Sequence, residues 1–376
     1  MAISASVLHW LTRPHLFTFL LVAIWVISLE RMRNRQSSRW WLLPLSMLFW
    51  VNLHGAFIAG FAILLIYWVG YLWDFVFIKE DDFRASTRLF RKHLLWGSVT
   101  SLAVTMLNPG GINVWKTGIG FIGNAYLVNN TIEYLSPDFH QAYSWPFLII
   151  VLLSMVLLGI NQRRISATSI FMIVAWTAMG MFSARNIPIF AVVVTPVLGE
   201  IGTRGIQLNK AFTRFINLDT GLLVVEKTKR YFSWAIPFTL IIILLLSQGM
   251  NLSSSKFGNT FDPRIFPVGA VNWLEKNPQG NRVFNEFTWG GYILYRLWPD
   301  QKVFIDGQTD FYGEQLTRQY AQVISMQDGW QQVIKEFNVD WMLLPANSVL
   351  ASGIVKIQGW HIVYQDETAV VISYDQ

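Results

Sequence analysis

Long hydrophobic blocks separated by short polar stretches dominate the first two thirds of the chain. Most blocks approach the ~20 residues that a helix needs to cross a ~30 Å hydrocarbon layer. Residues 40–77 would form one helix of about 57 Å at 1.5 Å per residue, so we expect a hairpin that turns at His54-Gly55. The pattern predicts eight membrane segments, at 14–29, 40–53, 56–77, 93–108, 146–160, 166–183, 187–201 and 232–249.

The polar stretches between these segments alternate in charge. Four loops carry 17 lysines and arginines, whereas the opposite short segments carry only Arg13, Lys116 and Arg185. Lysine and arginine stay on the cytoplasmic side of a membrane, so the basic loops are predicted to face inward. An even number of crossings then places both termini outside the cytoplasm. The net charge of +6 is explained by this topology, and no nucleic-acid partner is expected.

The composition agrees with an integral protein of the cytoplasmic (inner) membrane. Hydrophobic residues make up 53% of the chain and charged residues only 14%, against about 25% charged residues in soluble domains. The absence of cysteine excludes disulfides, thiolate metal sites and cysteine nucleophiles.

The pattern changes after the last hydrophobic block. Residues 1–252 are the predicted transmembrane domain, 253–261 a linker that starts with serines, and 262–376 a small extracytoplasmic α/β domain. In the last, we expect helices at 268–276, 289–297, 315–324 and 330–337 and strands at 282–285, 302–305, 340–344, 361–364 and 369–373. This alternation predicts a parallel sheet, and the hairpin around Asp366-Glu367 predicts an antiparallel edge.

Candidate chemistry concentrates at the outer membrane boundary. The predicted outer loop 109–145 is long, and its apolar positions suggest short helices on the membrane surface. Ionisable groups close to the hydrocarbon are costly and often mark functional sites. The polar residues expected at this boundary are Arg13, His15, Asn52, His54, Glu133, Asp138, His140, Arg185 and Asn186.

Arg13 and Arg185 depart from the inside-positive bias, so a local group should offset their charge. One possibility is an acidic partner such as Glu133. The other is an anionic ligand headgroup, because a guanidinium binds phosphate through two parallel hydrogen bonds.

The C-terminal domain carries no familiar catalytic motif. There is no phosphate-binding glycine loop, HExxH or GxSxG. The glycines of Trp289-Gly290-Gly291-Tyr292 are expected to let a helix start pack tightly against strand 282–285. Glu286, Asp306 and Asp310 follow predicted strands, where carboxylates either face a ligand crevice or cap a helix or turn.

Several stretches, in order along the chain, are similar to one protein family. They are Arg13-Pro14-His15-Leu16-Phe17-Thr18, Trp50-Val51-Asn52-Leu53-His54-Gly55-Ala56-Phe57, Leu107-Asn108-Pro109, Ser136-Pro137-Asp138-Phe139-His140, Arg185-Asn186-Ile187-Pro188, Trp289-Gly290-Gly291-Tyr292 and Val303-Phe304-Ile305-Asp306-Gly307. With these, the chain resembles the C-terminal portion of bacterial GT-C-type membrane glycosyltransferases, whose architecture is that of protein mannosyltransferases and aminoarabinose transferases.

The resemblance implies transfer of a sugar from a polyprenyl-phosphate carrier to an acceptor on the outer face. It implies that Arg13 and Arg185 hold the carrier phosphate, that His54, Glu133, Asp138 and His140 line the cavity, and that the outer domain binds the acceptor or caps the site. The general base of such enzymes lies in an acidic outer loop that precedes the stretch matching Arg13. The chain is therefore expected to be a fragment or a reduced homologue that works with a missing N-terminal half or a partner subunit. No metal or other cofactor is indicated.

Two other functions remain open at this point. A transporter usually has polar residues at the bilayer midplane and repeated halves, neither of which the sequence shows. A non-catalytic membrane protein that presents the outer domain to a partner is the stronger alternative, because the catalytic acidic loop is not found.

Overall fold

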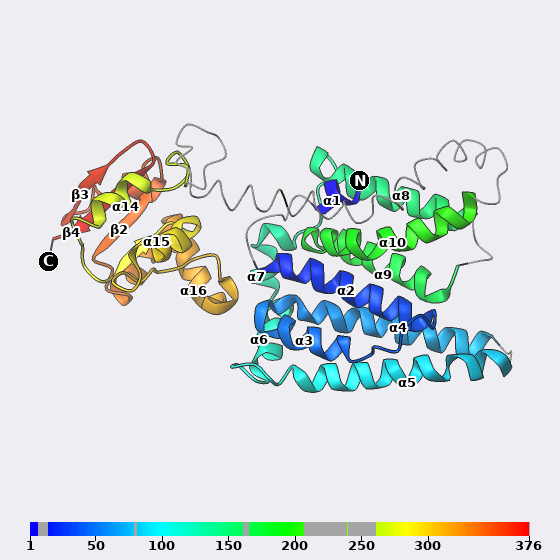
Figure 1. Ribbon diagram of the computed structural model, residues 1–376. Coiled ribbons are helices and arrows are strands. Elements are labelled where there is room, and N and C mark those ends of the chain that lie inside the picture. The colour runs from blue at the N-terminus through cyan, green and yellow to red at the C-terminus, as the bar shows by residue number, and fades with distance from the viewer. Residues whose placement is uncertain (7–13, 79–80, 161–164, 207–238, 240–260, 376) are drawn as a thin grey trace. The chain divides into compact units, whose positions relative to one another are not determined.

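The computed structural model describes residues 1–6, 14–78, 81–160, 165–206, 239 and 261–375 (Figure 1). The chain divides into two compact units, Met1–Leu223 and Val224–Gln376. The predicted segment 232–249, the linker before residue 261 and Arg13 lie outside the described residues.

The first unit is entirely helical within its described residues. Its elements are α1 Ala2–Ser6, α2 His15–Arg33, α3 Leu42–Leu53, η2 Gly55–Phe57, α4 Ile58–Phe77, α5 Asp81–Val104, α6 Asn113–Gly123, α7 Ala125–Asn129, η3 Ile132–Tyr134, η4 Ala142–Ser144, α8 Trp145–Ile160, α9 Ala167–Phe182, η5 Ala184–Asn186 and α10 Ile187–Ile206.

Four of these helical stretches are long and apolar enough to cross a membrane: His15–Arg33, Gly55–Phe77, Ala142–Ile160 and Ala184–Gly202. The helices Leu42–Leu53 and Ala167–Phe182 are apolar but shorter. The unit is therefore a helical membrane domain, and four spans, fewer than the predicted eight, meet the criteria of length and composition among the described residues.

The helix α5 differs most from its predicted segment. The charged stretch 81–92 was expected in a loop, but the helix already begins at Asp81 and ends at Val104. Residues 81–96 contain no glycine or proline that would interrupt a helix. Past the end, Asn108 closes a turn by accepting a hydrogen bond from Gly110 N and donating one to Thr105 O.

One contiguous apolar core joins the helices of the first unit. Helix α9 packs against α4 and α10, and α3 packs against α5. The crossing of α4 and α9 is so close that a Cβ built on Gly70 would lie 2.7 Å from Thr168 Cα. The outward faces are apolar as well, for example at Leu65, Leu72 and Val156, as expected for helices surrounded by lipid.

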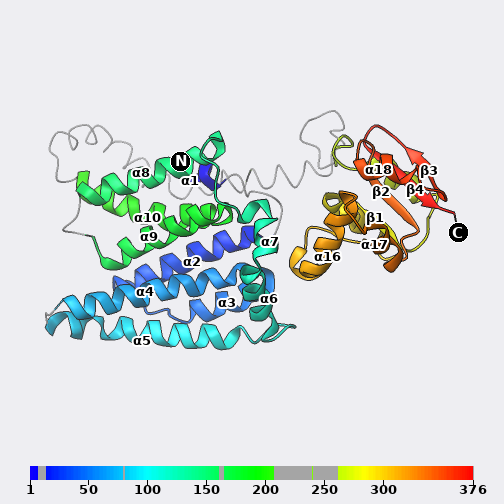
Figure 2. The same cartoon turned by 180° about the vertical axis from the view of Figure 1, so that it is seen from behind.

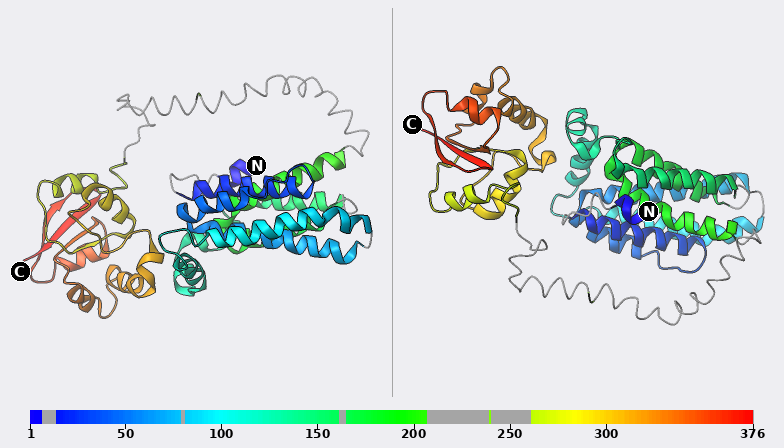
Figure 3. Two further views of the ribbon diagram at one scale, coloured as in Figure 1. Left: turned by 60° about the horizontal axis from the view of Figure 1, so that its bottom comes forward. Right: turned by 90° about the horizontal axis from the view of Figure 1, so that it is seen from above.

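The predicted short helices of the outer loop are present as α6, α7, η3 and η4. Figures 1 and 3 show α6 and α7 crossing the bundle at the end where α2 begins and α3 ends. This arrangement brings residues of the loop to the helix ends that carry the candidate polar side chains.

The second unit contains a mixed four-stranded sheet in the order β1-β2-β4-β3. Strands β1 Val283–Asn285 and β2 Trp341–Pro345 are parallel, while β4 Ala369–Tyr374 is antiparallel to both β2 and β3 Trp360–Gln365. The predicted closing hairpin is confirmed. Its turn is held by Asp366, whose Oδ1 accepts hydrogen bonds from the backbone of Thr368 and Ala369.

The predicted strand at 302–305 does not form. Asn285, which is fully buried, accepts a hydrogen bond from Phe304 N at 2.8 Å and donates one to Ile305 O at 2.9 Å. A side-chain amide thus occupies the position that a neighbouring strand's backbone would otherwise take.

Helices cover both faces of the sheet. Val283, Trp341 and Val371 pack with α14 Val268–Leu274 and α15 Gly290–Leu297. The alternate strand residues pack against α16 Thr309–Ile324, α17 Trp330–Glu336 and α18 Val349–Ile354, which are labelled in Figure 2.

The expected role of Gly290 needs correction in one respect. The atoms nearest to a Cβ at this position are Ile305 O and Asp306 Cβ, so the close approach of the glycine is to the end of segment 302–305. Gly291 has open space at its Cβ position.

Candidate functional site

The turn between α3 and α4 carries His54 in an extended conformation. Its Nδ1 accepts a hydrogen bond from Ala56 N at 3.3 Å and thereby caps the short helix η2. The predicted hairpin at His54-Gly55 is present, and it places the imidazole at the end of the bundle.

The tautomer of His54 follows from a second contact. The indole Nε1 of Trp50 donates to Thr18 Oγ1 at 3.0 Å, and Oγ1 also lies 3.0 Å from His54 Nδ1. Because Ala56 N donates to Nδ1, this nitrogen carries no proton, and the Thr18 hydroxyl is the donor in the second contact. Trp50 is fully buried and Thr18 is 1% exposed, which fixes both groups. Nδ1 therefore accepts twice, and a neutral imidazole carries its proton on Nε2.

Arg185 lies opposite that proton. It belongs to η5, the turn between α9 and α10, and its Nη2 is 3.5 Å from His54 Nε2. Guanidinium has no acceptor atom, so this contact is a hydrogen bond only when Nε2 is the unprotonated nitrogen; with the proton on Nε2, both groups direct N–H donors into the same space. The pair presents its donors to an acceptor that would bind between them.

The loop 109–145 also contacts the Arg185 guanidinium, through Tyr134. Arg185 Nη1 donates to the Tyr134 hydroxyl at 2.6 Å, and its Cζ lies 4.9 Å from the Tyr134 ring centroid. The backbone fixes this contact, because Ala184 N donates to Leu135 O and the Ser183 hydroxyl donates to Glu133 O. Glu133 precedes Tyr134 on η3 and is half-buried.

Burial, the charge of Arg185 and the charge of His15 lower the pKa of His54 to about 4. His15 starts α2, and its ring centroid is 6.2 Å from that of His54. His54 is therefore neutral near pH 7, and the positive charge of the cluster is that of Arg185.

Other predicted residues at this boundary have structural roles. Asn52 donates to Leu48 O and Leu107 O, which ties α3 to the chain after α5. Asn186 donates to Met179 O near the end of α9. Asp138 Oδ1 accepts from His140 N in a turn, and both side chains are exposed.

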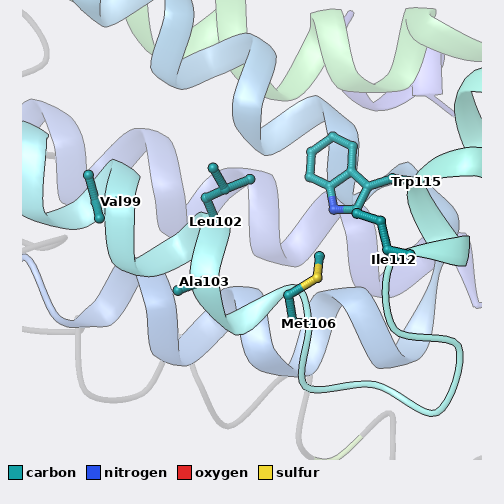
Figure 4. Close-up of a pocket in the computed structure, with 6 residues that line it drawn as sticks. All are labelled: Val99, Leu102, Ala103, Met106, Ile112 and Trp115. Carbon is teal, nitrogen blue, oxygen red and sulfur yellow. The ribbon is translucent and has the colours of Figure 1, made fainter.

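Figure 4 shows an apolar hollow of about 550 Å³ between the second half of α5 and the start of α6. Its lining consists of Val99, Leu102, Ala103, Met106, Ile112 and Trp115. The Trp115 ring lies 5.1 Å from that of Phe57, in the short helix that His54 caps. The hollow thus adjoins the polar cluster through one aromatic contact.

The outer-domain candidates form two separate arrangements. Glu286 Oε2 accepts from the Tyr320 hydroxyl at 3.4 Å, and burial together with this carboxylate raises the pKa of Tyr320. Asp306 Oδ1 accepts from Gln308 N at 2.8 Å and shapes the turn before α16. Asp310 is the second residue of α16, and its side chain lies outside the described residues.

No group of three histidine, aspartate or glutamate side chains in the described part of the chain is placed to hold a metal ion. Three partners in the polar cluster were not predicted from the sequence: Thr18, Trp50 and Tyr134. Thr18 and Trp50 lie in the stretches that carry the family resemblance, and that resemblance could have indicated them as site residues.

No protein-family model matches the chain, and no curated protein matches it in sequence.

Proposed function

We propose that the chain is part of a membrane-embedded GT-C-like glycosyltransferase, and that His54 and Arg185 hold the phosphate of a polyprenyl-phosphate-linked sugar. The convergence of Arg185 Nη2 and His54 Nε2 at 3.5 Å carries the proposal. Phosphate oxygens accept hydrogen bonds from both groups, and charge-assisted bonds to a guanidinium are about twice as strong as neutral ones. Arg13 joins this role through the family resemblance.

The apolar hollow supports a lipid-linked donor. A polyprenyl chain is a flexible hydrocarbon, and the six lining residues offer it an apolar wall. Because Trp115 contacts Phe57 next to the His54 turn, a lipid whose phosphate lies at His54 has its first prenyl units within reach of the hollow.

The proposed chemistry follows from the charge. When the bond from the sugar to the carrier oxygen breaks, negative charge develops on the departing phosphate. Arg185, held by Tyr134, stabilises that charge where it forms. The contribution proposed for the residues of this chain is donor binding and leaving-group stabilisation.

The proposal includes eight crossings with both termini outside the cytoplasm. Arg31 and Arg33 lie in the last turn of α2, and Arg35 and Arg39 follow it, at the end of the helix opposite His15. The inside-positive rule puts that end in the cytoplasm and the His54 cluster at the outer face. Because the chain has no cysteine, single cysteines test this directly: a membrane-impermeant thiol reagent added to cells should label Gln141→Cys and spare Gln36→Cys.

A ligand series tests the function. The full chain in lipid nanodiscs is titrated with a polyprenyl-phosphate sugar, with the corresponding polyprenol, and with inorganic phosphate. We expect the phosphate-bearing lipid to bind at least about 10-fold more tightly than the polyprenol, because a charged hydrogen bond contributes roughly 1.5–3 kcal/mol. Equal binding of the two lipids removes the phosphate role. Failure of both to bind leaves the non-catalytic membrane protein as the better description.

A further inference from the structure

An exposed aromatic patch lies at residues 261–265 and at the C-terminal end of α15 in the second unit. It consists of Phe261, Ile265, Tyr295 and Trp298, whose exposed fractions are 42%, 63%, 73% and 63%. Large apolar side chains in soluble domains are usually covered, and a group of them on one face marks a surface that contacts something else.

The patch is continuous with the core of the α14 and α15 layer. The Phe261 ring lies 4.5 Å from that of buried Tyr292 and 5.7 Å from that of Tyr295. Tyr295 follows the buried Tyr292 within α15, and Trp298 comes directly after the end of that helix. Ile265 is anchored because its carbonyl accepts a hydrogen bond from Trp289 Nε1 at 2.9 Å.

The composition of the patch points to a lipid surface. Tyrosine and tryptophan are enriched at membrane interfaces, where the ring meets apolar groups and the polar edge stays hydrated. The neighbouring arginines are already paired within the domain, Arg264 with Asp262 at 2.7 Å and Arg296 with Glu275 at 2.7 Å.

The short sequence distance between the last predicted membrane segment and Phe261 limits how far the second unit's described domain can lie from the bilayer. Phe261 stands twelve positions after 249, the end of the last predicted membrane segment. Twelve fully extended residues span at most about 40 Å, which is close to the diameter of a domain of this size. The tether therefore keeps the domain within about one domain diameter of the bilayer that the preceding segment is predicted to cross, and the face that carries Phe261 is within reach of it.

We propose that the aromatic patch inserts into the headgroup region of the outer leaflet and docks the α14 and α15 face of the domain on the membrane. The opposite layer, which contains α18, then faces the aqueous phase. This orientation is independent of whether the His54 cluster binds a phosphate.

Site-directed spin labelling tests the proposal in the full chain, reconstituted in nanodiscs. Single cysteines are introduced as Tyr295→Cys and Trp298→Cys, with Val349→Cys as the matched control. Val349 is 70% exposed and starts α18, on the other side of the sheet. Each label is probed with oxygen, which concentrates in lipid, and with a water-soluble nickel chelate.

We expect the oxygen-to-nickel accessibility ratio to be several-fold higher at positions 295 and 298 than at 349. A ratio equal to that at 349 overturns the proposal, because the patch is then in water. Labels shielded from both reagents overturn it as well, since a protein partner or a second copy would then cover the patch.

Discussion

Arg185 Nη2 lies 3.5 Å from His54 Nε2, although the two residues are 131 positions apart in the sequence. His54 is fixed by Thr18 from α2, and Arg185 is fixed by Tyr134 from the outer loop. Four separate parts of the chain, namely α2, the turn after α3, the loop 109–145 and η5, therefore meet at these two residues. An anion that binds between the two N–H groups would accept a hydrogen bond from each of them.

The tautomer of His54 is the first testable consequence. Because Nδ1 accepts from Ala56 N and from the Thr18 hydroxyl, we expect the proton on Nε2. Nitrogen-15 NMR of histidine-labelled protein in nanodiscs, assigned with His54→Gln, should show one unprotonated Nδ1. Exposed His140 serves as the internal control and should show exchange between tautomers. A protonated Nδ1 at His54 contradicts the inferred geometry.

Stability should depend on pH through the same residue. The folded chain holds the pKa of His54 at about 4, against ~6.5 for an unperturbed histidine. Between these values the unfolded chain takes up a proton that the folded chain refuses, so the free energy of unfolding falls as pH drops from about 6.5 to 4. Thermal unfolding in detergent should show a smaller decline for His54→Gln. Identical declines would locate the effect elsewhere.

The close crossing of α4 and α9 predicts a sharp size limit at Gly70. Gly70→Ala places a methyl group against Thr168 Cα, and such overpacking costs about 1–3 kcal/mol. We expect a lower unfolding midpoint in detergent. Gly159→Ala on α8, where nothing lies within 4 Å of the added Cβ, should leave the midpoint unchanged.

In the second unit, the Asn285 side chain makes the hydrogen bonds to Phe304 N and Ile305 O that a neighbouring strand would otherwise make. Asn285→Ala leaves Phe304 N and Ile305 O buried without their partner, and each such loss costs roughly 1–3 kcal/mol. Hydrogen exchange measured by mass spectrometry should show faster exchange of the 303–305 segment. The control Asn281→Ala, at an exposed position, should exchange like the parent protein.

Apolar blocks of span length predicted a helical membrane domain, because inside a bilayer the backbone groups of such a block must be paired within a helix. Four of the eight predicted spans meet the criteria of length and composition among the described residues. It also predicted the hairpin at His54, where polar residues interrupt a hydrophobic run. The start of α5 does not follow from the charge pattern. The charged residues in 81–92 suggest a loop, but the stretch 81–96 contains no glycine or proline and is helical.

The prediction of a strand at 302–305 is wrong for a different reason. Val303, Phe304 and Ile305 have the composition of a buried strand, and two of them are indeed buried. Their backbone is satisfied by the Asn285 side chain, a tertiary contact between positions 20 apart that no local pattern reveals.

The candidate site was predicted in part. The charge pattern identified Arg185 because the segments on the predicted outer side carry few basic residues. The same pattern would identify any isolated arginine there, and it does not predict what the arginine contacts. The role of Tyr134 depends on the folding of the outer loop, and the role of Thr18 depends on the packing of α2 against α3, so neither follows from spacing. Asp138 and His140 lie in one turn, where Asp138 Oδ1 accepts a hydrogen bond from His140 N, and their predicted place in the cavity stays a prediction.

The central claim is that Arg185 binds the carrier phosphate, and a matched pair of variants tests it. The full chain, Arg185→Gln and the control Arg264→Gln are titrated with a polyprenyl-phosphate sugar in nanodiscs, with unfolding midpoints recorded in parallel. Arg264 is exposed on the outer domain and paired with Asp262. We predict that Arg185→Gln raises the Kd by about 10- to 100-fold while the control binds like the parent. An unchanged Kd in the folded Arg185→Gln protein contradicts the account.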